Sequence, residues 1–426
     1  MKKFLTCLLA VCLIAGLTAC LVQPETPDLP DGPIVPSDAA VAEPVNATVG
    51  ISLPSNTDIY WKRSAQEMTR QLEAMGHTVI VAGADGTVEE QIRQLRDLID
   101  RDVDCLVIAA IDSLALLKEQ KVAEAKGISV IAYDRMLMDS DAVCGFVSYD
   151  FEAMGAAVAR QIIAQCSLET ALQEKRPQTI EFFMGSPEDN SALLFHQGLM
   201  RELLPYLESG ALICRTGRTS FEDTCTSTQD EKIAYESCLE RLSREYPAGD
   251  LNICCTASDS LAYSCLEALR KAGYTDENWP VITGQGGGVG AVKRIVGNTQ
   301  AITVYKDPLH LAQLCSRMVN RVAYGLTPQT DNIVSNNHVL QVPTVYSPAT
   351  VIHAGNYEEE LIRTRIYTLR QVTPDPTEST DPTGETTADT TSGETTAATS
   401  APETAAATTP PETTAKPQPS SPANAA

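Results

Sequence analysis

The chain is poor in aromatic residues and in positive charge, and each shortage excludes a class of protein. Only 5% of its residues are aromatic, and 32 basic residues stand against 55 acidic ones, a formal net charge of -23. A nucleic acid or an anionic lipid surface needs Lys and Arg to neutralise its phosphates, so neither partner is expected. Part of the acidic excess lies in the last segment, where residues 372–426 hold a single Lys.

The motifs of enzymes and of metal sites are also missing. The sequence has no G-x-S-x-G, no Walker loop and no H-E-x-x-H, and its five histidines are scattered. The run GQGGGVG lacks a dinucleotide fingerprint because Val289 stands where glycine is needed. No helix-turn-helix of a transcriptional repressor opens the chain. We therefore predict that the protein is not an enzyme and uses no cofactor, no metal and no catalytic residue.

Cysteine is abundant but lacks metal-ligand spacing. No C-x-x-C pair occurs, and ten of the thirteen cysteines lie in the body of the chain: Cys105, Cys144, Cys166, Cys214, Cys225, Cys238, Cys254, Cys255, Cys265 and Cys315. Several sit in apolar runs, so we interpret them as small buried hydrophobic residues. An extracytoplasmic location permits disulfides, and Cys214 with Cys225 is the first pair to test.

The N-terminus, MKKFLTCLLAVCLIAGLTAC, has the features of an export signal. Lys2 and Lys3 precede an apolar stretch that is too short to span a bilayer comfortably. Leu17-Thr18-Ala19-Cys20 resembles a bacterial lipobox, whose family is lipidated on the cysteine and cleaved before it. We predict that residues 1–20 are a lipoprotein signal peptide and that Cys20 anchors the protein outside the cytoplasmic membrane. An ordinary signal peptide or a buried helix is the alternative.

Two segments with the composition of flexible chain flank the middle. Residues 21–47 are rich in Pro and acid and lack Lys, Arg and aromatic residues, which predicts a solvated linker. Residues 371–426 form a Thr/Pro/Glu-rich tail without aromatic residues. We predict that this tail is disordered, because it cannot bury enough apolar area to offset the entropy of ordering.

Between these segments, strand-like runs alternate with helical periodicity. Runs at 48–54, 77–83, 104–110 and 128–134 are separated by amphipathic segments, and the pattern restarts at 179–185. Residues 186–189, Ser-Pro-Glu-Asp, suggest a helix start with Pro at its first position. Repeated β-α alternation indicates a parallel sheet covered by helices. The fold class is therefore α/β with two successive Rossmann-like lobes.

Polar side chains follow several of the predicted strands. Asp112, Asp134, Arg135, Asn190, Asp259 and Lys306 stand at strand or helix ends, and Tyr60 and Trp61 follow the first strand. Ligands of such sheets bind beyond the carboxyl ends of the strands. Carboxylates accept hydrogen bonds from hydroxyls, while Arg, Lys and Asn donate them, and aromatic rings stack on a sugar ring. Each residue alone could also serve as a helix cap or a surface ion-pair partner.

The middle of the chain resembles the type I periplasmic sugar-binding proteins, in the branch that binds xylose and multiple sugars. The segments that carry the resemblance are LPSNTDIYW, CLVIAAIDS, GISVIAYDR, FFMGSPEDNSALLFHQGLM, TASDSLA, VITGQGGGVGAVKRI and TVYKD. The resemblance implies three hinge crossings, near 143–149, 305–307 and 341–346. It assigns residues 48–147 and 306–340 to an N-terminal lobe, and residues 148–305 and 341–370 to a C-terminal lobe.

The resemblance also implies roles for single residues. Trp61 would pack on the sugar, Asp134 and Arg135 would bind ring hydroxyls, Asn190 and Asp259 would contribute from the second lobe, and Lys306 would lie at a crossing. The chain departs from the family pattern at four positions, where Tyr60 replaces a basic residue, Phe151 an asparagine, Gln229 a tryptophan and Gly286 an aspartate. Tyr60, Phe151, Gln229 and Asp112 are further candidates for ligand contacts.

We therefore predict a monomeric extracytoplasmic lipoprotein that captures a monosaccharide for the permease and ATPase of an ABC importer. Two alternatives remain open from the sequence. The protein could report sugar occupancy to a membrane sensor protein, or it could be a degenerate binding protein with a different ligand or none. The departures from the pattern motivate the second alternative, since losing one partner of a buried polar contact costs about 1–3 kcal/mol.

Overall fold

A computed structural model describes residues 45–226, 231–247 and 249–374. The signal peptide with Cys20, the linker as far as residue 44, Gln229 and the tail from residue 375 lie outside the described residues. All described residues belong to one compact unit, residues 1–384. No helix in this described part is both long and apolar enough to cross a membrane.

The first sheet has seven strands in the order β11-β12-β5-β4-β3-β1-β2. Its strands are β1 (Thr48–Leu53), β2 (Thr78–Gly83), β3 (Cys105–Ile108), β4 (Ser129–Tyr133), β5 (Val143–Tyr149), β11 (Val334–Asn336) and β12 (Gln341–Ser347). All neighbours are parallel except β11 and β12. The order β-α-β-α-β-α-β predicted from residue 48 to residue 134 is confirmed.

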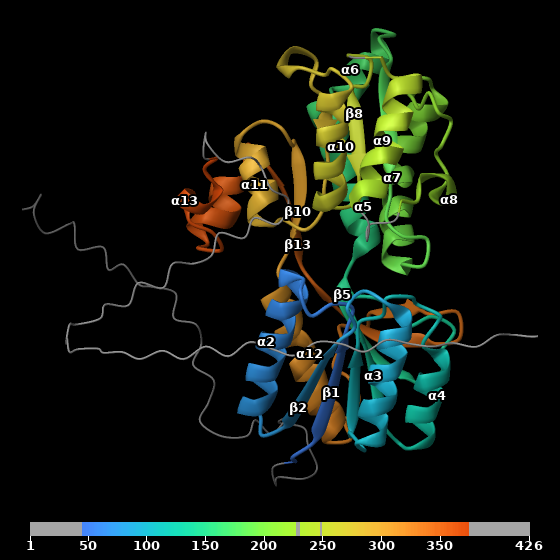
Figure 1. Cartoon of the computed structure of the whole chain (residues 1–426), viewed down its shortest axis with the longest axis vertical. Coiled ribbons are helices and arrows are strands. Elements are labelled where there is room, and N and C mark those ends of the chain that lie inside the picture. Colours follow the sequence, from blue (N-terminus) through green and yellow to red (C-terminus); the bar gives the residue numbers. More distant parts are fainter. Residues whose placement is uncertain (1–44, 227–230, 248, 375–426) are drawn as a thin grey trace, which may run out of the picture. The chain divides into compact units, whose positions relative to one another are not determined.

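Helices cover both faces of this sheet. They are α2 (Ile59–Ala74), α3 (Val88–Asp100), α4 (Leu117–Ala125) and α12 (Pro308–Ala323). Successive strand residues point to opposite faces. Ile51 and Val107 therefore share a core with α2 and α12, whereas Leu106 and Ile108 share one with α3 and α4 (Figure 1). Burial on both faces explains why these strands are apolar throughout rather than alternating.

The second sheet has four parallel strands in the order β7-β6-β8-β9. Its strands are β6 (Gln178–Phe183), β7 (Leu212–Ile213), β8 (Ile253–Thr256) and β9 (Val281–Ile282), and its helices are α5 (Phe151–Gln165), α6 (Leu168–Gln173), α7 (Asn190–Glu208), α8 (Phe221–Thr224), α9 (Glu231–Glu245), α10 (Asp259–Lys271) and α11 (Val289–Val296). Ile180 and Phe182 pack with α5 and α7, while Phe183 and Cys254 pack with α9 and α10.

The remaining elements are short and lie outside the two sheets. An antiparallel pair joins β10 (Ile302–Lys306) to β13 (Ala349–His353), followed by a short π-helical segment (Glu358–Arg363) and α13 (Leu369–Val372). A 3-10 turn (Asp276–Asn278) precedes β9. Residues 371–374 of the predicted tail are described and include the end of α13, where Val372 is buried.

The third crossing is expected near residues 341–346, which form β12. The assignment of residues 341–370 and of residues 148–149 to the second lobe is wrong where they meet, because β12 pairs in parallel with β5, from Thr344 opposite Phe146 to Ser347 opposite Tyr149. The chain therefore stays with the first sheet through Ser347 and pairs with β10 only from Ala349. A strand sequence shows that a strand forms, but not which of two sheets it joins, because either sheet satisfies its hydrogen bonds.

One helix start also differs from the prediction. α7 begins at Asn190, not at Pro187, because the Asp189 carboxylate accepts the Ser191 amide (2.9 Å) and caps the helix. A side-chain cap that satisfies a free amide decides this boundary. Helix α4 begins at Leu117, after a turn whose amides bind Asp112.

The ten body cysteines are all free. Cys214 and Cys225, the first pair to test, are not joined, and the Cys214 Sγ contacts the Glu181 carboxylate at 3.6 Å instead. Burial raises the pKa of the Cys255 thiol to about 12. Buried thiols of this kind are unreactive and behave as small apolar side chains.

The close approach of α5 and α7 depends on two glycines. A Cβ on Gly155 would lie 2.0 Å from the Phe195 carbonyl oxygen, and one on Gly198 would lie 1.9 Å from the Glu152 carbonyl oxygen. Both neighbours are helix backbone, which cannot move without separating the helices. The two glycines therefore set the distance between α5 and α7.

Gly155→Ala should accordingly lower the free energy of unfolding by about 1–3 kcal/mol through overpacking. Urea unfolding of the purified protein measures this change. Gly288→Ala is the matched control, because no atom lies within 4 Å of its added Cβ and its φ is -66°. Equal stability of the Gly155 variant and the wild type would show that α5 and α7 do not pack at this distance.

Candidate ligand-binding site

Asp134 lies at the carboxyl end of β4 in an unusual backbone conformation. Its φ of 60° is in the left-handed region, which non-glycine residues rarely adopt. The Asp134 amide donates to the Val147 carbonyl (2.8 Å), and the Ser148 hydroxyl donates to the Asp134 carbonyl (2.6 Å). Strand β5 thus holds the strained residue in place, as is common at functional sites.

The carboxylate of Asp134 is buried and only half satisfied. The residue is 4% exposed, and its Oδ2 accepts a hydrogen bond from the Tyr60 hydroxyl at 2.7 Å. Its Oδ1 is buried and has no hydrogen-bond partner among the described residues. An ionised oxygen without a donor is costly to bury. The site therefore presents an acceptor that a hydroxyl group would satisfy.

Tyr60, the donor to this carboxylate, contacts Trp61 of the same helix, and Trp61 in turn contacts Arg135. The Tyr60 and Trp61 rings meet edge to face with centroids 4.9 Å apart. The guanidinium carbon of Arg135 lies 5.7 Å from the centroid of the Trp61 ring. The Asp58 side chain caps α2 by accepting the amides of Tyr60 and Trp61, and so fixes both rings at the helix start.

Lys306 approaches the same group of residues from β10. Its Nζ lies 5.3 Å from the Tyr60 ring, 5.4 Å from the Tyr149 ring and 5.2 Å from the Phe151 ring. No ion pair to a carboxylate is found for Lys306 within the described segments. The aromatic faces hold the ammonium group, whose donors are not committed to a neighbouring acid.

The start of α7 contacts the first sheet's strand ends. The Arg135 Nε lies 3.2 Å from Oδ2 of Asp189, and the Ser113 hydroxyl donates to the Glu188 carbonyl at 3.1 Å. Asn190 follows Asp189 as the first residue of α7 and is half-buried. The structure therefore brings Asn190 next to the residue that pairs with Arg135.

Burial raises the pKa of the tyrosines in this site. The Tyr60 pKa is well above its usual value because the ring is buried and because Asp134 carries a negative charge nearby. The Tyr149 pKa is raised for the same two reasons. Both phenols remain protonated at neutral pH, so Tyr60 is a lasting donor to Asp134, and Tyr149 donates to the Asp307 carbonyl (2.9 Å).

Asp259 lies in a different hydrogen-bond network. Its Oδ1 accepts from Thr303 Oγ1 (2.7 Å) and Gln300 Nε2 (2.9 Å), and its Oδ2 accepts from the Gly287 amide (2.8 Å). A Cβ on Gly284 would lie 2.2 Å from the Asp259 Oδ1. The glycine run thus makes room for the Asp259 carboxylate, which binds the loop that leads to β10.

The remaining predicted site residues are Asp112, Phe151 and Gln229. Asp112 Oδ1 accepts the amides of Leu114 and Ala115, at 2.7 and 3.0 Å, and so serves a turn. Phe151 joins the aromatic group around Lys306, whereas Gln229 lies outside the described residues. The structure adds Tyr149, the last residue of β5, and the ion-pair role of Asp189, which lies between β6 and α7.

The family model named periplasmic binding protein domain matches residues 49–327. The chain belongs to the periplasmic binding proteins, in the type I sugar-binding class. The multiple sugar-binding periplasmic receptor ChvE of Rhizobium radiobacter is 31% identical to it over 328 residues, which cover 76% of this chain and 92% of the receptor. The D-xylose-binding periplasmic protein of Escherichia coli is 30% identical over 304 residues, 71% of this chain and 86% of that protein.

A solved structure supports the same assignment. The solute-binding protein of an ABC transporter from Clostridium phytofermentans, crystallised with β-D-glucose, has a TM-score of 0.72 and 32% identity, covering 76% of this chain and 99% of its own. Membership of this class confirms the predicted fold and the prediction that the binding protein is not an enzyme. Among the described residues of this binding protein, no group of three or more His, Cys, Asp or Glu side chains has the geometry of a metal site.

Tyr60→Phe should destabilise the ligand-free binding protein by about 1–3 kcal/mol, because Asp134 would lose its one side-chain donor while it stays buried. Urea unfolding measures the change. Tyr206→Phe is the control, since the Tyr206 hydroxyl has no hydrogen-bond partner among the described residues. The proposed pairing of Tyr60 with Asp134 fails if the two variants lose the same free energy.

Proposed function

We propose that this binding protein captures a monosaccharide of the pentose or hexose type at the strand ends around Asp134 and delivers it to an ABC importer. The observation that carries the proposal is the buried Oδ1 of Asp134, an acceptor without a donor beside Trp61, Arg135 and Lys306. A sugar hydroxyl supplies the missing donor, and a charged acceptor makes that hydrogen bond a strong one.

The surrounding groups suit the rest of a sugar. Arg135, Asn190 and Lys306 donate to hydroxyl oxygens, and the rings of Trp61 and Phe151 offer apolar faces to the C–H side of a pyranose. A polyol needs donors and acceptors together, and an aromatic face, and these residues provide all three. Asp259 already accepts three hydrogen bonds, so it keeps one acceptor position for the ligand and mainly shapes the loop beside β10.

The relatives support an aldose as the first ligand to test. The relatives at 30–32% identity are described as binding multiple sugars, D-xylose or β-D-glucose. This chain keeps Asp134, Arg135 and Lys306 but has Tyr60 and Gly286 where the family pattern has a basic and an acidic residue. We therefore infer a pyranose as the ligand class and take D-glucose and D-xylose as probes.

Binding is coupled to closure of two lobes in this proposal. The chain passes from the first sheet toward the second after Tyr149, returns after Lys306, and leaves again after Ser347. Arg135 from one lobe pairs with Asp189 of the other. A ligand that contacts both lobes stabilises the closed form by its extra contacts there.

Asp134→Asn should weaken monosaccharide binding by about 10-fold or more, because a neutral amide replaces a charge-assisted acceptor. Calorimetric titration of residues 45–374 with D-glucose, D-xylose and a panel of pentoses, hexoses and their acids measures the affinity. Asp139→Asn is the matched control, since Asp139 also has a positive φ but pairs with His338 on the surface.

Two outcomes would contradict the proposed function. If no monosaccharide in the panel gives a saturable heat signal with the wild type, the protein is not a sugar-binding protein of this kind. If Asp134→Asn and Asp139→Asn bind the same sugar equally well, the ligand does not contact Asp134.

We also propose that the mature protein is anchored by lipid on Cys20 outside the cytoplasmic membrane. Cys20→Ala should abolish incorporation of a fatty-acid label and move the protein from the membrane fraction to the soluble extracytoplasmic fraction. Cys12→Ala is the control, because Cys12 lies inside the apolar run that is cleaved off. Equal labelling of both variants would rule out Cys20 as the lipidation site.

A further inference from the structure

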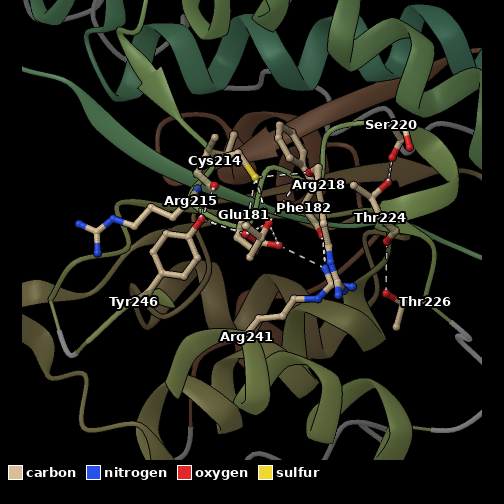
Figure 2. A network of polar contacts seen from close by, with 12 residues as sticks. Glu181, Phe182, Cys214, Arg215, Arg218, Ser220, Thr224, Thr226, Arg241 and Tyr246 are labelled. Carbon is tan, nitrogen blue, oxygen red and sulfur yellow. Dashed lines mark hydrogen bonds and ion pairs between the residues drawn. The ribbon is translucent and has the colours of Figure 1, made fainter. Parts of the chain in front are cut away.

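A second polar cluster lies on β6, away from the site just described. The Glu181 carboxylate is fully buried and accepts hydrogen bonds from Tyr246 Oη (2.9 Å) and Thr216 Oγ1 (2.9 Å). The Cys214 Sγ lies 3.6 Å and the Arg241 Nη1 3.3 Å from the same carboxylate. Figure 2 shows Cys214 of the loop after β7, Arg241 of α9 and Tyr246 just after α9 around Glu181 of β6. Glu181 is therefore saturated by its own neighbours.

Arg241 is the cation of this cluster, and only some of its N–H donors have an acceptor. It is 7% exposed, its Nη1 also donates to the Phe182 carbonyl (2.9 Å), and its guanidinium carbon lies 4.8 Å from the centroid of the Phe183 ring. Its Nε is buried and unpartnered, and its Nη2 has no acceptor in the described part of the chain. A guanidinium carries five N–H donors, so most of its donor capacity remains unused.

A cavity of about 160 Å³ borders Arg241, between the loop after β7 and helix α9. It is lined by Thr216, Arg218, Ser237, Glu240, Arg241, Arg244 and Glu245. The cavity is smaller than the pockets that hold drug-sized ligands, which measure roughly 300–1,000 Å³. It has room for one compact ion.

The loop that carries Arg218 is held in place, whereas the Arg218 charge is not neutralised. The Arg218 amide donates to Thr216 Oγ1 (3.2 Å), and its carbonyl accepts the Cys214 thiol (3.4 Å). No acceptor for its guanidinium is found in residues 45–226, 231–247 and 249–374. The two acidic residues of the rim lie nearer to Arg244, whose nitrogens are 3.6 and 3.9 Å from Glu240 and Glu245.

We propose that this cavity binds a tetrahedral oxyanion, as inorganic phosphate or as the phosphate group of a small ester. The structure brings three guanidinium groups to one cavity, those of Arg218, Arg241 and Arg244, and the two glutamates of its rim lie 3.6 and 3.9 Å from Arg244. Planar guanidinium forks match phosphate oxygens, and the Ser237 hydroxyl adds a donor from α9. An anion between Arg218 and Arg241 would also remove their mutual repulsion.

Thermal unfolding of the full protein with increasing sodium phosphate, at constant ionic strength set with sodium chloride, tests this site. The wild type should show a saturable rise in melting temperature with phosphate. Sulfate and glycerol phosphate in separate series distinguish a general tetrahedral anion from an ester. Arg218→Gln should weaken phosphate binding about 10-fold or more, and its exposed side chain makes no contact that the fold needs.

Arg215→Gln is the matched control, because Arg215 lies on the same loop but pairs with Asp250 and does not line the cavity. It should keep the phosphate response of the wild type. The oxyanion site is overturned if phosphate gives no saturable shift, or if Arg218→Gln and Arg215→Gln respond alike. Arg218→Gln should also keep wild-type sugar binding, so this result separates failure of the oxyanion site from failure of the sugar site.

Discussion

The hydrogen bond between Tyr60 and Asp134 is the contact on which the candidate site depends. It joins the start of α2 to the end of β4, and it leaves one oxygen of a buried carboxylate without a donor. The left-handed backbone of Asp134 is held by Val147 and Ser148 of β5, the strand that leads out of the first sheet. The strand that holds Asp134, the proposed ligand acceptor, is therefore also the strand that leads to the first crossing.

The second crossing also contributes a residue to the candidate site. Lys306 ends β10, and its ammonium group contacts the rings of Tyr60, Tyr149 and Phe151, which belong to α2, β5 and α5. The preceding residue, Tyr305, packs against Gly287 of the loop that Asp259 holds. Residues from both sheets thus meet at the strands through which the chain passes. In the proposed function, a ligand bound there would contact the elements that move when the lobes open and close.

The cores of both lobes are built without disulfides in the described residues. Their cysteines are small apolar residues beside larger ones, as with Cys254 and Phe183 in the second lobe or Cys105 and Ile131 in the first. Stability of an exported protein of this size comes from two buried parallel sheets rather than from cross-links. Cys214 differs from these core cysteines, because its free thiol contacts the buried Glu181 carboxylate in the second polar cluster.

The sequence alone indicated the fold class, the alternation of strands and helices as far as the strand that ends at Lys306, and most of the polar residues near the strand ends. Hydrophobic periodicity reports which segments bury an apolar face, and the carboxyl ends of parallel strands must share one edge of a sheet. Asp134, Arg135, Trp61 and Lys306 were found in this way. The tertiary structure alone decided two matters: that β12 joins the first sheet, and that Asp259 is enclosed by the glycine loop. Both depend on hydrogen-bond partners distant in sequence, which a local pattern does not encode. The start of α7 is different, because Asp189 caps that helix through Ser191, two residues on, and a local pattern offered both Ser186 and Asp189 as caps.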